Sequence, residues 1–256
     1  MQCPIAFRQK ALSGMVLVWA ILVCCAAFVT LPATASEFSI SPINLQFAPG
    51  ARSAVVSISN TDQRPIRFQL SLVEWTQDAN GADLYMPSDD LVFFPRQLTV
   101  LPGDKAIARV GPKHVQTGVE KTYRLRVEEL PEPAPESPGA TLNFTITFAI
   151  PVFLGPQETR PVALISPLLL QDGKLLATVQ NTGNSHFRIE SLEVKGTDGY
   201  SQQLGGWYLL AGSSRQHTLN IPPEICRAQR QLNLSVKVGE QTFSSNLNIE
   251  PSMCGT

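Results

Sequence analysis

The feature that most constrains this chain is a period of two in its apolar residues, repeated in short segments over most of its length. The segment IRFQLSLVEW at 66–75 alternates apolar with polar side chains, and KTYRLRVEEL at 121–130 does the same. Such alternation is typical of strands that bury one face, and turn residues such as Gly, Pro, Asn and Asp separate the segments. Helical periodicity is almost absent after the first 35 residues. The pattern predicts an all-β fold of packed sheets.

The first 35 residues have the pattern of a signal peptide. A basic start precedes an uncharged apolar run, and ATAS at 33–36 offers a small-residue cleavage site after Ala35. The run is shorter than the roughly 18 to 20 apolar residues that a membrane-spanning helix needs. A lipoprotein signal at Cys24 or Cys25 is the alternative, but the residues before them are bulky where small ones are expected. We therefore expect a mature chain that starts near Ser36 and works outside the cytoplasm.

Cleavage at this point changes the cysteine count. Of five cysteines in the chain, only Cys226 and Cys254 lie beyond the signal peptide. Two cysteines in an oxidising compartment indicate one disulfide, which would join the C-terminal tail to the body of the protein. A reactive thiol or a metal site would need partner residues that the sequence does not place near either cysteine.

The charge balance gives no sign of a nucleic-acid partner. The chain has 20 Lys and Arg against 21 Asp and Glu, and loss of Arg8 and Lys10 with the signal leaves 18 against 21. Nucleic-acid-binding proteins usually carry a basic patch or stripe, which this sequence does not have. We expect no nucleic-acid partner.

The sequence also lacks a group of residues suited to catalysis. His114, His186 and His217 stand far apart, with no carboxylate or cysteine at ligand spacing. Zinc and copper sites usually need at least three such ligands. No nucleophile elbow and no phosphate-binding glycine loop occurs. We expect the histidines to be surface or loop residues, and we expect no metal, no cofactor and no enzymatic activity.

The chain divides into two halves with similar patterns. The segment at 155–161 is polar, flanked by proline and without periodicity, as linkers are. On either side of it, Asn60 to Arg67 and Asn181 to Arg188 have the same spacing, each with Asn-Thr, a loop and a strand start. A repeated sandwich explains this likeness, and chance is the alternative because Asn-Thr is common before turns.

We therefore predict two tandem immunoglobulin-like β-sandwich domains that follow a cleaved signal peptide. The predicted division is a signal peptide at 1–35, a first domain at 36–155, a linker at 156–161 and a second domain at 162–256.

The segment TLNFTITFAIPVF at 141–153 is long for a strand, and its apolar residues all fall on one face. Alternating strands usually face their own core. This segment, however, follows a proline-rich loop and precedes the linker, where the last strand of a sandwich is commonly an edge. An exposed apolar edge is prone to aggregation unless it is meant to pair with another chain.

Several motifs together resemble a known family, the periplasmic pilus-assembly chaperones that are PapD-like. The motifs are VSISNTDQRPIRFQL, FFPRQLTVLPGDKAIARV, YRLRVEELP and the long alternating strand before the linker. The resemblance covers nearly the whole mature chain. It implies a non-enzymatic periplasmic protein whose partners are pilus or fimbrial subunits and an outer-membrane usher.

The resemblance also implies how such a protein works. In this family the pilus subunit is an immunoglobulin-like sandwich that lacks its last strand, and the chaperone lends its own G strand to fill the gap. This donor-strand complementation is a form of β-strand addition. Carried onto this sequence, the lent residues are Leu142, Phe144, Ile146 and Phe148.

The sequence departs from the family's usual pattern at two positions. Typical members hold the carboxylate at the subunit's C-terminus with an arginine in the first strand and a lysine in the G strand. Here Asn44 and Pro151 stand at those positions. The chain is in this respect more similar to the archaic, Csu-type branch. Since a guanidinium grips a carboxylate well, the candidate anchors are Arg124 and Arg96, with an ordinary surface or interstrand role as the alternative for each.

Two other functions remain open. An exported binding or adhesive module with two sandwiches would bury the alternating strand in its own core. An exported enzyme would need clustered acids, aromatics or histidines; Trp75, Trp207 and Tyr208 offer a sugar platform, although core packing explains them equally well. In a chaperone, the exposed strand would also permit weak self-association.

Overall fold

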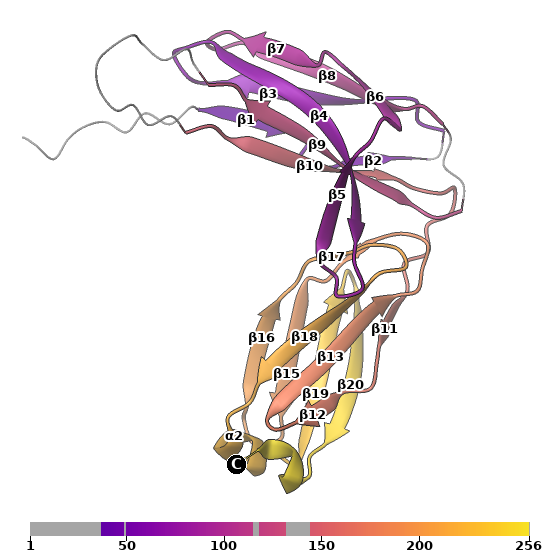
Figure 1. The fold of residues 1–256 in the computed structure, drawn as a ribbon, viewed down its shortest axis with the longest axis vertical. Coiled ribbons are helices and arrows are strands. Elements are labelled where there is room, and N and C mark those ends of the chain that lie inside the picture. The colour runs from indigo at the N-terminus through magenta and orange to yellow at the C-terminus, as the bar shows by residue number, and fades with distance from the viewer. Residues whose placement is uncertain (1–36, 49, 115–117, 132–143, 256) are drawn as a thin grey trace, which may run out of the picture. The chain divides into compact units, whose positions relative to one another are not determined.

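The computed structural model describes residues 37–48, 50–114, 118–131 and 144–255. The predicted signal peptide therefore lies outside the described residues. Residues 37–256 fall within one compact unit, which is built almost entirely of β-strands (Figure 1). Among the described residues, no helix has the length and apolar character needed to cross a membrane.

The first sandwich begins with a sheet of four strands. Its order is β1 (Phe38–Ser41), β3 (Ala54–Asn60), β8 (Lys105–Pro112) and β6 (Leu91–Phe94). All its neighbours are antiparallel. Val56 and Ile58 on β3 are fully buried, while the alternate residues Val55, Ser57 and Ser59 are not. The alternation in the sequence thus turns one face of this sheet inward.

The second sheet of this sandwich carries the long alternating strand. Its order is β2 (Leu45–Phe47), β10 (Thr147–Leu154), β9 (Lys121–Glu129), β4 (Ile66–Gln77) and β5 (Asp83–Pro87), with β7 (Gln97–Val100) also paired to β4. The β2–β10 pair is parallel, whereas β10 and β9 are antiparallel. β10 thus has β9 along one edge and β2 along part of the other.

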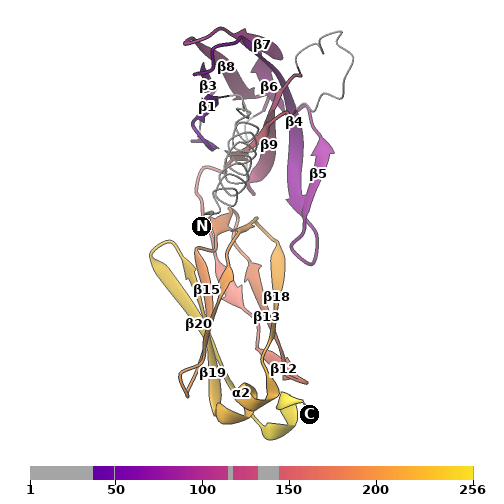
Figure 2. The same ribbon diagram turned by 90° about the vertical axis from the view of Figure 1, so that its left-hand side faces the viewer.

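The second sandwich has two main layers, which Figure 2 shows facing one another. One layer contains β11 (Ala163–Ile165), β13 (Lys174–Asn181), β12 (Leu169–Gln171) and β18 (Ser214–Asn220). The other contains β16 (Ser201–Gly205), β15 (Ser191–Gly196), β19 (Gln231–Val238) and β20 (Gln241–Asn248). A short pair, β14 (Phe187–Arg188) with β17 (Tyr208–Leu209), completes it.

Each sandwich encloses its own hydrophobic core. The first core draws on residues between Leu45 and Leu154, and the second on residues between Ala163 and Cys254. Close packing of two sheets over such a core is the architecture of immunoglobulin-like domains. The predicted all-β fold with two tandem sandwiches is confirmed.

The same type of turn occurs once in each sandwich. Asn60 is buried, and its side-chain amide nitrogen donates to the carbonyl oxygens of Arg64 (2.7 Å) and Val100 (2.9 Å). In the second sandwich the buried Asn181 donates in the same way to Ser185 (2.8 Å) and Leu209 (3.0 Å). The equal spacing seen in the sequence thus corresponds to one hydrogen-bonded turn used twice.

Their carbonyl oxygens act alike as well. Oδ1 of Asn60 accepts from the backbone N–H of Asp62 (2.8 Å), and Oδ1 of Asn181 from that of Gly183 (3.0 Å). Asn before a turn often bonds the backbone two residues on, so local chemistry explains this part of the motif. The bonds to Val100 and Leu209 reach across the sandwich and are specific to the fold.

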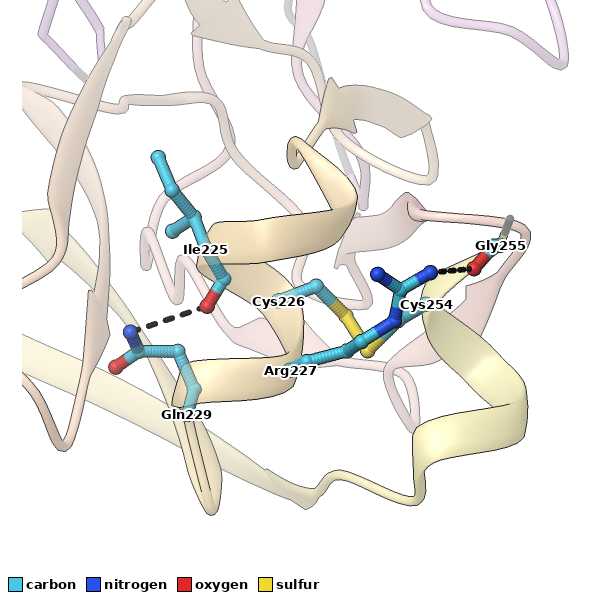
Figure 3. Close-up of a disulfide and its surroundings, with 6 residues drawn as sticks. All are labelled: Ile225, Cys226, Arg227, Gln229, Cys254 and Gly255. Carbon is cyan, nitrogen blue, oxygen red and sulfur yellow. Dashed lines mark hydrogen bonds between the residues drawn. A yellow bond between two sulfur atoms is a disulfide. The ribbon is translucent and has the colours of Figure 1, made fainter.

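The predicted disulfide is present and closes the C-terminal end of the second sandwich (Figure 3). Cys226 lies on the short helix α2 (Pro223–Ala228) and Cys254 on the 3₁₀ turn η1 (Pro251–Cys254). Both cysteines are fully buried, and Arg227 beside them donates to the carbonyl oxygen of Gly255 at 2.7 Å. The tail is thus held by a covalent bond and a hydrogen bond.

Candidate functional site

The alternating face of the segment at 144–154 changes its environment along its length. The side chains of Phe144, Ile146 and Phe148 are 81%, 38% and 42% exposed, whereas Ile150 is 3% exposed and Val152 is fully buried. Every one of these residues has the same phase, so all point from the same face of the strand. The first half of this face lies open, and the second half belongs to the protein's own core. Leu142 lies outside the described residues.

The backbone of β10 changes partner at the same place. Glu129 on β9 donates its N–H to the carbonyl oxygen of Ile146 at 2.9 Å, so these two residues form a hydrogen-bonded pair. Such pairs alternate in an antiparallel ladder, which puts the nitrogen of Pro151 on the opposite edge. On that edge, β2 pairs only from Val152 onward. Within the described residues, no strand covers this edge between Phe144 and Pro151.

Aromatic contacts hold one of the exposed side chains. The ring of Phe148 lies edge-on to Phe38 of β1, with ring centres 5.5 Å apart. Phe38 in turn packs edge-on against the fully buried Phe68, at 4.8 Å. Edge-to-face pairs of this kind are favourable. Phe148 is therefore oriented by the core although it is half exposed, while Phe144 stands free in solvent.

Three positions form a row across the outer face of the second sheet. Arg124 on β9 lies opposite Pro151 on β10. Asn44 directly precedes Leu45, which pairs with Val152 in the parallel strands, so Asn44 stands beside Pro151 on the other side. The outward phase of Asn44, Pro151 and Arg124 is the same, because their neighbours in sequence point into the core.

The guanidinium of Arg124 is enclosed by aromatic rings. It lies 3.7 Å from the centre of the Trp75 ring and 5.9 Å from that of Trp207, and the whole residue is only 6% exposed. One of its terminal nitrogens donates to the carbonyl oxygen of Ala149 at 3.3 Å, but its buried Nε has no hydrogen-bond partner among the described residues. A desolvated cation with an unsatisfied N–H favours an anionic partner.

Several solved structures of pilus chaperones share this fold. A chain of the CsuC–CsuE chaperone–tip adhesion subunit complex of Acinetobacter baumannii, from archaic chaperone-usher Csu pili, shares 19% identity with a TM-score of 0.61, over 82% of this chain and 98% of that one. The CupB2 chaperone of Pseudomonas aeruginosa shares 16% with a TM-score of 0.53, over 83% and 100%. A chain of the Salmonella enterica SafA pilin–SafB chaperone complex shares 17% with a TM-score of 0.53, over 84% and 99%. At such identities the likeness shows the fold.

A family model decides the assignment. Residues 37–160 match the N-terminal domain of PapD, described as a pili and flagellar-assembly chaperone. The chain is a PapD-like pilus-assembly chaperone. No curated protein matches its sequence. Chaperones of this family are periplasmic and non-enzymatic and belong to the chaperone–usher pathway.

The two candidate anchors of this PapD-like chaperone lie far apart. Arg124 shares a row with Asn44 and Pro151, the positions at which the resemblance expects an arginine and a lysine. Arg96 lies exposed between β6 and β7, 5.3 Å from the Phe93 ring. β7 pairs with β4, so two strands, β4 and β9, separate it from β10. The structure places Arg124 beside β10 and leaves Arg96 away from it.

A third arginine, Arg126, also belongs to this surface. It lies on β9 opposite Ala149 of β10 and Ser71 of β4, and it is exposed on the same face as Arg124. Sequence reasoning missed its role as a candidate, although the alternation in YRLRVE already put Arg124 and Arg126 on one side of the strand. Arg126 is thus exposed on the face on which Arg124 is buried.

The aromatic residues that suggested a sugar platform serve as packing. Trp75 is fully buried and forms a small cluster with Phe153 and Leu210, against which Tyr208 packs. Trp207 is partly exposed, and its ring N–H donates to the carboxylate of Asp83 at 3.0 Å. With Trp75 buried, these three aromatic side chains do not form an exposed surface, and packing is the correct interpretation.

The histidines do not form a metal site. No group of three His, Cys, Asp or Glu residues in the described ranges is arranged to hold a metal ion. His114 is exposed, as expected, whereas His186 stacks on Phe153 at 3.6 Å and lies 2.7 Å from the carboxylate of Glu120. His217 lies on β18, and burial lowers the pKa of its ring. The expectation of surface or loop positions therefore agrees with His114 and His186 and was wrong for His217, which lies partly buried on a strand.

Proposed function

We propose that this chaperone binds pilus subunits by lending them the apolar residues of its G strand. The lent side chains are Leu142, Phe144, Ile146 and Phe148, and the strand stops being available at Ile150. The observation that carries the proposal is the change in exposure along one strand face, which falls from 81% at Phe144 to 3% at Ile150. A strand built only for its own core would bury the whole face.

The open edge of the strand supports the same mechanism. From Phe144 to Pro151 its outer backbone edge has no partner strand in the described part of the chain. A subunit that lacks its last strand has the complementary need, so main-chain hydrogen bonds would join the two. Pro151 contributes no N–H to that edge, so pairing with the subunit ends there.

The apolar side chains supply most of the binding energy. Full burial of an apolar side chain contributes about 1.5–3 kcal/mol, so Phe144, Ile146 and Phe148 contribute about 4–9 kcal/mol gross. Phe148 gives less than its share because Phe38 and the core already cover part of it. The loss of rotational and translational freedom offsets much of this total.

The row that contains Arg124 is the proposed site for the carboxylate at the subunit's C-terminus. Arg124 lies next to the positions of the two missing anchors and has a buried, unpaired Nε. Arg126 presents a second, exposed guanidinium two residues further along β9. Arginine binds carboxylates in a bidentate way, so one residue of this pair can replace the family's arginine and lysine. Arg96 is the weaker candidate because of its distance from β10.

The remaining features of the proposal follow from the family. The chaperone would be exported by a signal peptide that is cleaved after Ala35, and it would deliver its subunits to an outer-membrane usher. Its domains would be 36–155 and 162–256, joined at 156–161; β10 ends at Leu154 and β11 begins at Ala163. The missing anchors and the likeness to the CsuC complex support the archaic, Csu-type branch.

The test compares two variants that introduce the same charge one residue apart. Phe144→Glu places a carboxylate on the lent face, and Thr145→Glu places it on the opposite face. Tagged forms of both, and of the wild type, are purified from the native periplasm, and mass spectrometry identifies what co-purifies. We expect a small immunoglobulin-like subunit in near-stoichiometric amount with the wild type and Thr145→Glu, and its loss with Phe144→Glu.

The result also separates the competing functions. A Phe144→Glu protein that keeps the subunit would contradict strand donation. If all three proteins fold and none brings down a subunit, an exported binding or adhesive module explains the fold better. Weak self-association through the same open edge is part of the proposal, and light scattering that shows only monomer at high concentration would count against it.

A further inference from the structure

A second unpaired surface lies on the other sheet of the first sandwich. In the sheet β1–β3–β8–β6, the inward residues fill the core, so the residues between them point to solvent. Four of these outward residues are large, apolar and exposed: Val55 on β3, Ile107 on β8, and Val92 and Phe94 on β6. Phe94 is 75% exposed, which is unusual for a side chain of this size on a strand.

These four residues form one continuous patch. Arg109 on β8 lies opposite Val55 on one side and opposite Phe94 on the other. Ile107 precedes Arg109 by two residues on the same face, and Val92 precedes Phe94 in the same way. Directly opposed residues on one face stand about 4.5–5.5 Å apart, so the apolar side chains surround Arg109. Apolar patches of this kind on a soluble protein often mark interaction sites.

The charged residues on the strands of this face are all basic. Arg109 and Lys105 point outward and are exposed, and no strand of the sheet carries Asp or Glu at an outward position. Neither cation forms an ion pair among the described residues. The nearest acids lie just beyond strand ends: the exposed Glu37 precedes β1, Asp104 precedes β8, and Asp90 accepts hydrogen bonds from Lys121 and Tyr123.

We propose that this face binds a segment of another protein that carries apolar side chains together with carboxylates. Carboxylates on the segment would pair with Arg109 and Lys105, and its apolar side chains would cover Phe94 and its neighbours. A second copy of the same face fits badly, because a symmetric pair would bring arginine against arginine. A lipid surface usually requires a larger cluster of basic residues than these two.

This interaction is separate from strand donation. β10 belongs to the other sheet, so a subunit held along β10 leaves the outer face of β1–β3–β8–β6 open. The chaperone would then bind two partners at once, each through a different sheet.

The test uses defined peptides as probes. Two ten-residue peptides alternate the same valine and phenylalanine residues with either glutamate or lysine, and binding is measured by fluorescence anisotropy. We expect the glutamate peptide to bind the wild-type protein at least tenfold more tightly than the lysine peptide. Arg109→Glu, Lys105→Glu and Phe94→Ser should each weaken binding of the glutamate peptide, and Arg109→Glu should improve binding of the lysine peptide.

Controls separate this face from the donor strand. Leu169→Ser removes an exposed leucine from β12 of the second sandwich and should leave peptide binding unchanged, as should Phe144→Glu. Equal affinity for the two peptides, or full binding by Arg109→Glu, would overturn the proposal. So would a wild-type dimer that Phe94→Ser converts to monomer in sedimentation, or binding to phosphatidylglycerol vesicles in place of the peptide.

Discussion

Asn60 and Asn181 are buried side chains whose amide groups connect a turn to a neighbouring strand. Each donates two hydrogen bonds to carbonyl oxygens and accepts one from the backbone. Leucine or alanine could fill the space but could not satisfy these backbone groups. The same chemistry in both sandwiches indicates that this turn supports the fold wherever it occurs.

Replacement of either asparagine should therefore be costly. We expect Asn60→Ala and Asn181→Ala each to lower the free energy of unfolding by about 2–4 kcal/mol, because buried carbonyl oxygens lose their donors. Urea denaturation would measure the change. Asn60→Asp keeps the acceptor and loses the donors, so it should also destabilise; a loss below about 0.5 kcal/mol in the alanine variants would contradict the role assigned to the amides.

Arg124 shows what the sequence leaves open at this scale. Its position on a strand beside β10 follows from the pattern YRLRVEEL. Its burial does not, because the rings that enclose it belong to Trp75 and Trp207, which are 132 positions apart in the chain. A side chain's exposure depends on distant segments that a local pattern does not describe.

At the scale of elements, β10 combines two roles in one alternating strand. Ile150 and Val152 are part of the first core, and Phe144 and Ile146 lie outside it. The division coincides with the start of β2, which takes the outer edge from Val152 onward. One half of the strand thus holds the fold together, and the other half remains available.

This division predicts that two truncations in β10 differ in their effect on the free energy of unfolding. We expect Ile150→Ala to lower the free energy of unfolding by about 2–5 kcal/mol, as for other buried isoleucines. Phe144→Ala should change it by less than about 0.5 kcal/mol, because that side chain is solvated. Denaturant titration of both variants checks the contrast, and equal losses would show that Phe144 belongs to the protein's own core.

The strands themselves could be predicted well from the sequence. The segments IRFQLSLVEW and KTYRLRVEEL form β4 and β9, since their alternation matches burial of one face. The limit of the exposed half of β10 could not be predicted, because the alternation continues through Val152 without a break. The exposed half of β10 ends close to the point where β10 begins to pair with β2, a strand about 100 residues earlier. The outer patch at Phe94 could not be predicted either, because it depends on the pairing of β3, β8 and β6, which are distant in the sequence.

At the scale of the whole molecule, the disulfide ties the end of the chain to the second sandwich. It joins residues 28 positions apart. Both cysteines belong to the second core, whereas the buried residues of β10 belong mainly to the first. We therefore expect the disulfide to stabilise the second sandwich and to have no direct part in subunit binding.

Removal of the disulfide tests this separation. We expect Cys226→Ala/Cys254→Ala to lower the free energy of unfolding of the second sandwich by about 3–4 kcal/mol, the entropy of a closed loop of this length. A reducing agent should have a similar effect on the wild type in chemical denaturation. Subunit co-purification at low temperature should persist, and its loss from a folded variant would show that the second sandwich takes part in binding.

The change of role at Ile150 has a consequence for how often one molecule can act. In the proposed mechanism, the half of β10 that is offered to a subunit contributes little to the chaperone's own core, and the half that builds the core is not offered. A subunit that leaves would therefore take no structural element with it, and the chaperone would need no refolding before the next one arrives. We expect a reusable carrier, in which a small pool of molecules serves a fibre of many subunits.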